Sequence, residues 1–148
     1  MSRVGFYHLH GNQIGSVLPK LLERVLGEGM RAVVIAPDEA RVRALDRMLW
    51  TYESASWLPH GTALDGSPDV QPILLGTDAA NPNGATCLFL TGGVSSGHFE
   101  GYDRVFALFD GNDDTELRQA RALWRSLKDG DHELAYWRQD GRRWRKAG

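Results

Sequence analysis

The sequence has 148 residues, of which 42% are hydrophobic and 24% charged, a composition typical of one compact globular domain. Its single cysteine excludes an internal disulfide framework, and no apolar run reaches the ~18 residues of a membrane-spanning helix or forms a signal-peptide core near residue 1. The net charge is −2, but residues 118–148 hold 9 Lys and Arg against 4 Asp and Glu, whereas residues 1–117 hold 8 against 15. We therefore expect a cytoplasmic protein, and its basic C-terminal part is either a side that faces an anionic partner or a tail that only aids solubility.

The first half of the chain alternates between strand and helix patterns. A short strand is predicted over residues 4–9, and apolar residues at helical spacing predict a helix over 16–26. Residues 31–36 are nearly all apolar, which is typical of a strand buried on both faces of a parallel sheet. A second helix is predicted over 37–52. This order favours an α/β fold with right-handed parallel crossovers.

The second half contains shorter elements. The same patterns predict strands at 56–59, 72–76, 86–90, 104–109 and 132–139, a helix at 113–128, and polar loops at 61–72 and 92–99. We expect residues 1–140 to form a single α/β domain and the basic residues 141–148 to be a mobile tail.

The signals for an enzyme are weak. The first strand–helix connection, Gly11–Gly15, lacks the G-x-G-x-x-G spacing of a dinucleotide site, and the loop Gly92–Gly97 is not followed by the lysine of a P-loop. The five histidines lack metal-ligand spacing, and the acidic residues 110–116 fit helix capping better than a calcium loop. We predict no catalytic residue, cofactor or metal. A nucleotide-binding enzyme working at Gly11–Gly15 is the weakest of the alternatives.

One face of the helix predicted over 113–128 is cationic, and Trp124 lies at its border. An indole flanked by two guanidinium groups can hold an apolar ring and a carboxylate together. Such a face is often only solvated, or complements the helix C-terminus. The basic, aromatic segment 136–146 that follows the helix favours a binding site. The cations recur at i, i+3, i+7 and i+10, as Arg118, Arg121, Arg125 and Lys128.

Two further tryptophans suggest a second surface. Trp50 lies one residue beyond Leu49, about 100° from the inward face of its helix. Tryptophan is enriched in binding hot spots, so Trp50 is a candidate partner contact, and Trp57 is a candidate to join it. The alternative is that both cover a secondary core under the middle loop.

The residues alone also allow a different function, which is direct binding of single-stranded nucleic acid. Trp137, Trp144 and the arginines of the tail could stack on bases and contact phosphates, as in proteins that bind single-stranded nucleic acid.

Several blocks of residues, in order and at this chain length, resemble one known family, the chi subunit of the bacterial DNA polymerase III holoenzyme. The resemblance covers nearly the whole chain. The blocks are Phe6-Tyr7, ALDRMLW at 44–50, SWLPH at 56–60, FDGN at 109–112, ARALWR at 120–125 and GDHELAYW at 130–137.

The resemblance implies a non-enzymatic, Rossmann-like α/β fold, with a mostly parallel central sheet and helices on both faces. It also implies an adaptor that links the clamp loader to single-stranded DNA-binding protein (SSB) by holding the acidic C-terminal tail of SSB. The family's Arg, aromatic and Lys positions for that tail fall on Arg121, Trp124 and Arg125. A further basic position of the family falls on Leu117, so either Arg118 compensates or this contact is lost.

The resemblance places Tyr136 near the same site. It implies that Trp50 and Trp57 belong to a second surface that contacts the clamp loader through a subunit such as psi. Direct binding of nucleic acid is expected to be weak or absent, and no cofactor is implied.

Overall fold

The computed structural model describes residues 3–10, 14–51, 60–62, 72–77, 84–92, 94, 101–128, 130, 132–140 and 143–146. None of the helices in these ranges is long and apolar enough to cross a membrane. In chain order the elements are β1 (Arg3–Leu9), α1 (Ile14–Gly27), β2 (Ala32–Ile35), α2 (Glu39–Thr51), β3 (His60–Thr62), β4 (Ile73–Gly76), β5 (Cys87–Leu90), β6 (Arg104–Asp110), α3 (Asp114–Lys128), β7 (Glu133–Asp140) and β8 (Arg143–Lys146).

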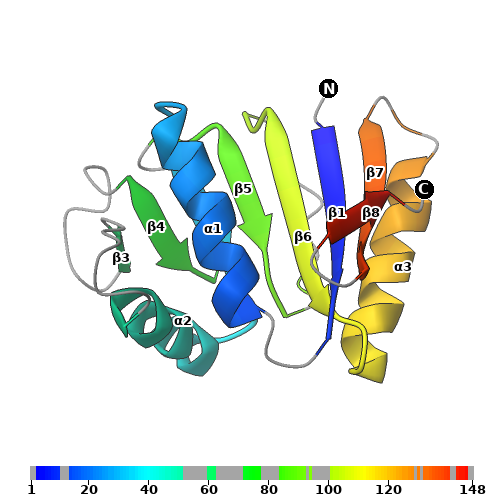
Figure 1. The fold of residues 1–148 in the computed structure, drawn as a ribbon, viewed down its shortest axis with the longest axis horizontal. Coiled ribbons are helices and arrows are strands. Elements are labelled where there is room, and N and C mark those ends of the chain that lie inside the picture. The colour runs from blue at the N-terminus through cyan, green and yellow to red at the C-terminus, as the bar shows by residue number, and fades with distance from the viewer. Residues whose placement is uncertain are drawn as a thin grey trace.

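The described strands form one sheet in the order β3-β4-β2-β5-β6-β1-β7-β8 (Figure 1). Every neighbouring pair is parallel except β7 and β8, which are antiparallel. The short apolar strands β2 and β5 are buried at every position, because both faces of the sheet are covered there. The α/β class and the mostly parallel sheet predicted from the sequence are confirmed.

Helices cover both faces of the sheet. On the α1–α2 face, side chains of α1 and α2 pack on β2, β4, β5 and β6. On the α3 face, Ala120 and Leu123 of α3 pack with residues that include Val4 and Phe6 of β1. Alternation along β1 divides its side chains between the two cores: Phe6 belongs to the α3 face, and Leu9 belongs to the α1–α2 face.

The acidic residues that precede α3 fix its first turn. The Asp113 carboxylate accepts hydrogen bonds from the backbone N–H groups of Thr115, at 2.9 Å, and Glu116, at 3.0 Å. The Asp110 carboxylate accepts another from the N–H of Asn112, at 2.9 Å. These bonds satisfy amides that would otherwise have no partner within the helix. The capping role predicted for the acidic run is confirmed, and it sets where α3 starts.

Two segments differ from the sequence expectation. Residues 60–62, which overlap the expected polar loop, form the edge strand β3, which is too short for its alternation to be visible. Residues 143–146, expected in a mobile tail, form β8 and pair with β7. Three basic residues in this strand hide its strand pattern, although Trp144 packs against the α1–α2 core. The strand expected at 56–59 lies outside the described residues.

Candidate functional site

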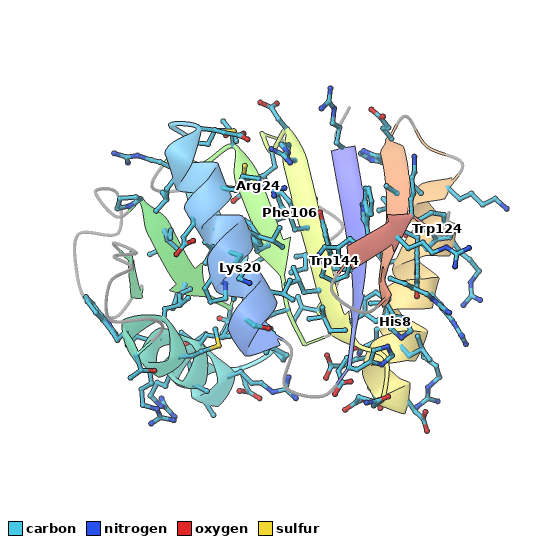
Figure 2. The ribbon with its side chains drawn as sticks, viewed as in Figure 1. His8, Lys20, Arg24, Phe106, Trp124 and Trp144 are labelled. Atoms are coloured by element: carbon cyan, nitrogen blue, oxygen red, sulfur yellow. The ribbon has the colours of Figure 1, made fainter. Side chains whose placement is uncertain are left out.

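The helix α3 places its cations on the outside and its apolar residues on the sheet. Ala120 and Leu123 are buried, and Trp124 is half-buried at the border of this contact. In Figure 2, Trp124 lies on α3 beside β7. The cationic side chains predicted as one face are all exposed: Arg118, Arg121, Arg125 and Lys128.

Two aromatic rings of the sheet hold the Trp124 indole. Its ring lies edge-on to Phe6, with centroids 5.2 Å apart, and edge-on to Tyr136, at 5.9 Å. Phe6 and Tyr136 are nearly parallel, at 6.5 Å, and Phe6 is fully buried. Edge-to-face pairs of this kind are worth about 0.5–1.5 kcal/mol each beyond area burial. The indole is therefore anchored on one side and accessible on the other, and the structure brings the predicted residues Trp124 and Tyr136 together.

The α3 cations next to this indole are not neutralised by neighbouring carboxylates in the described part of the chain. Arg121, Arg125 and Lys128 form no ion pair with another described residue. Arg118 donates a hydrogen bond from Nε to the backbone oxygen of Asp114, at 3.3 Å. The exposed guanidinium groups of Arg121 and Arg125, on the cationic face that Trp124 borders, can thus meet an anion from solution.

Two residues that the sequence did not assign to the site contact Tyr136, namely His8 on β1 and Arg138 on β7. His8 Nδ1 and the Tyr136 hydroxyl share a hydrogen bond of 2.8 Å, which fixes the Tyr136 ring. The Arg138 guanidinium lies over that ring, 5.9 Å from its centroid. A side chain on Gly111 would collide with the His8 imidazole, so the close approach requires glycine there. The register that pairs His8 with Arg138 carries the basic surface of α3 onto β7.

Burial, together with the positive charges of Arg138, His10 and Arg121, lowers the pKa of His8 below its usual value of 6.5. The unfolded chain therefore takes up a proton at this histidine before the folded chain does as the pH falls. The contribution of neutral His8 to the free energy of unfolding is therefore complete above about pH 6.5. This contribution decreases as the pH falls below that value.

We expect the difference in the free energy of unfolding between the wild type and His8→Asn to shrink from about pH 7.5 to about pH 5. Urea denaturation across that range measures it. A constant difference between the two proteins would contradict the neutral, hydrogen-bonded state of His8.

The second predicted surface lies on a different helix. Trp50 of α2 is 61% exposed, a large exposed apolar side chain in the described part of the molecule. Figure 1 places α2 near β3 and β4, at the opposite end of the sheet from α3 and β7. Trp57 lies outside the described residues. The structure therefore separates the Trp50 surface from the α3 site along the length of the sheet.

Within the described ranges, no group of three or more His, Cys, Asp or Glu side chains could hold a metal ion. The first strand–helix connection, which the weakest alternative uses for nucleotide binding, falls mainly on residues 11–13, outside those ranges.

The fold defines the chain as a Rossmann-like α/β domain. The solved structure of the C-terminal domain of the DEAD-box protein Dbp5 superposes with a TM-score of 0.54 and 12% identity, over 92% of this chain and 90% of that one. At this identity the likeness shows the fold alone.

The sequence comparisons are more specific. Residues 1–135 match the family described as DNA polymerase III chi subunit, HolC, and the chain belongs to that family. A relative from Rickettsia prowazekii (strain Madrid E), named as a probable DNA polymerase III subunit chi, is 28% identical over 90 residues. That match covers 61% of this chain and 54% of the relative, so it spans about half of the relative's length.

Proposed function

We propose that the protein is a non-catalytic replication adaptor of the cytoplasm that binds the acidic C-terminal tail of SSB on α3 and links it to the clamp loader. Membership of the chi family supports a role of this kind in DNA replication. The observation that carries the proposal is the half-buried Trp124 indole, held by Phe6 and Tyr136 at the border of a helix face that exposes Arg121 and Arg125.

The chemistry of the tail fits this surface. The family resemblance implies a tail that ends in an aromatic residue with a free carboxylate. This terminal ring would pack against the accessible side of Trp124, and Arg121 and Arg125 would neutralise the terminal carboxylate and the preceding aspartates. A charge-assisted hydrogen bond contributes about 1.5–3 kcal/mol, and a buried ring contributes a similar amount. Ordering a disordered tail opposes these gains, so we expect micromolar affinity that weakens with added salt.

The residues around this centre extend the proposed contact. Lys128, one helical turn after Trp124, and Arg118, one turn before Arg121, would meet further acidic residues of the tail. Leu117, at a position that is basic in the family, packs against the core of the α3 face. Arg118 is thus the side chain left to replace it, and Tyr136 would border the docked ring.

Capture by SSB tests the proposal directly. We expect immobilised full-length SSB to retain the protein and SSB lacking its last residues not to retain it, because the tail supplies both the ring and the negative charges. The capture should weaken as the salt concentration rises. Equal retention by both forms of SSB would contradict tail recognition.

We further propose that the Trp50 surface binds the clamp loader, through psi or a comparable subunit. Trp50→Ala should change the free energy of unfolding by no more than about 0.5 kcal/mol, because the side chain is largely exposed. The same variant should lose capture of clamp-loader subunits and keep that of SSB, whereas Arg125→Ala on α3 should keep capture of the clamp-loader subunits and weaken that of SSB. Full capture by Trp50→Ala would contradict this surface.

A further inference from the structure

A second basic and aromatic site lies on the opposite face of the sheet from α3. A cavity of about 380 Å³ opens between α1 and the strands β1, β7 and β8. Lys20 and Arg24 of α1 form one wall, and three aromatic side chains of the strands form the other (Figure 2). Cavities of a few hundred Å³ are large enough to enclose a flat ring and its substituents.

The aromatic wall is ordered by contacts within the fold. Tyr7 of β1 stacks on Phe106, with centroids 6.0 Å apart, and meets the edge of Trp144 of β8 at 5.3 Å. Trp137 of β7 lines the same cavity. Because all three lining aromatics are only half-buried, their outer surfaces remain open to a stacking partner.

The opposite wall supplies positive charge. Lys20 and Arg24 lie one helical turn apart on α1, and both are exposed. No described residue that lines this cavity is acidic. Lys146 follows Trp144 by two residues on β8, so it lies on the same face of the sheet and adds a third cation near the rim.

The site continues beyond the first cavity. A second cavity of about 180 Å³ also includes Tyr7 and Trp137 and extends over β1 and β6 to Arg3 and Arg104. Each of these arginines is paired with a glutamate, at 3.6 and 3.4 Å. Glu133, the partner of Arg3, also lines the second cavity. The two cavities share Tyr7 and Trp137, and together we call them the groove. Their extended arrangement suits a chain of repeating units better than one small molecule.

We propose, in contrast to the expectation from the family resemblance, that this groove binds single-stranded nucleic acid. Bases would stack on the surfaces of Trp144 and Trp137, and the backbone phosphates would contact Lys20 and Arg24. Every base has a flat face, so aromatic walls of this kind bind single strands with little sequence preference. An acidic peptide would use the cations but would leave most of the three aromatic surfaces uncovered, so the observations favour the nucleic acid.

The test uses the full chain and a fluorescein-labelled oligothymidylate in an anisotropy titration at about 50 mM salt. We expect Lys20→Glu combined with Arg24→Glu to weaken binding at least tenfold. Lys20→Gln with Arg24→Gln should weaken it less and should reduce the salt slope by about 1.4, because each phosphate contact on a single strand contributes about 0.7. Circular dichroism checks that the exposed substitutions leave the fold intact.

Arg43→Glu with Arg47→Glu is the matched control, since these exposed arginines have the same spacing on α2 and lie outside the groove. We expect this control to bind the oligonucleotide within about twofold of wild type. The proposal is overturned if the wild type does not bind the oligonucleotide, or if both charge-reversed pairs lose the same affinity for it. It is also overturned if the Lys20 and Arg24 variants keep their affinity for the oligonucleotide and lose affinity for an acidic peptide instead.

Discussion

Arg125→Ala is expected to weaken the binding of an acidic peptide with a C-terminal aromatic residue by tenfold or more, and Trp124→Ala by a similar factor. One charge-assisted contact is worth about 1.5–3 kcal/mol, and 1.4 kcal/mol corresponds to a factor of ten in affinity. Arg125 is exposed and forms no ion pair with the described residues, so its removal changes the peptide contact and not an internal one. Isothermal titration at low salt measures both variants.

Arg43→Ala is the control for the loss of one surface charge, because Arg43 is an exposed arginine on α2, far along the sheet from α3. It should bind the peptide as the wild type does. The Arg125 effect should also shrink as salt is added, whereas most of the Trp124 effect should persist, because burial of a ring is not screened by ions. If Arg125→Ala and Trp124→Ala both bind the peptide with unchanged affinity, the proposal that α3 binds the SSB tail is contradicted.

Phe6→Ala is expected to reduce the free energy of unfolding by about 3–5 kcal/mol and to reduce peptide affinity as well. Phe6 is fully buried, so its truncation leaves a cavity in the core of the α3 face. It also removes the ring against which Trp124 and Tyr136 pack, at 5.2 and 6.5 Å. Without this support the indole gains rotamer freedom that binding must then remove.

A matched variant separates these two effects. Phe89 is also fully buried, but it stacks on Phe106 at 4.4 Å in the core of the α1–α2 face. We expect Phe89→Ala to lose a similar amount of stability and to keep its peptide affinity, measured at a temperature where both variants are folded. Equal affinities in Phe6→Ala and Phe89→Ala would contradict the role of Phe6 as the support of the site.

Local patterns in the sequence were enough to predict most of the fold. The apolar run at 31–36 identifies β2, because a strand covered on both faces has almost no polar position. The spacing of cations from Arg118 to Lys128 predicts one helical face, because neighbours on a helix recur every three or four residues. Both signals depend on residues that are close in the chain.

What the sequence could not predict depends on long-range pairing. The bond between His8 and Tyr136 joins residues 128 positions apart, and only the register of β1 and β7 brings them together. The groove between α1 and β8 combines Lys20 with Trp144 for the same reason. The hydrophobic periodicity of a segment does not indicate which strands become its neighbours in the sheet. For this reason we predicted Trp144 to lie in a mobile tail.

The position of β1 constrains how the protein can be made. This strand, the first of the described sheet in chain order, is hydrogen-bonded on one side to β6 and on the other to β7, both of which are more than ninety residues later. During translation, both edges of β1 therefore remain unpaired until β6 and β7 have been synthesised. Contacts so distant in sequence slow folding, and unpaired strand edges attract other chains in the meantime. Early pairing of β1 with β6 or β7 would therefore lower the exposure of these edges during folding.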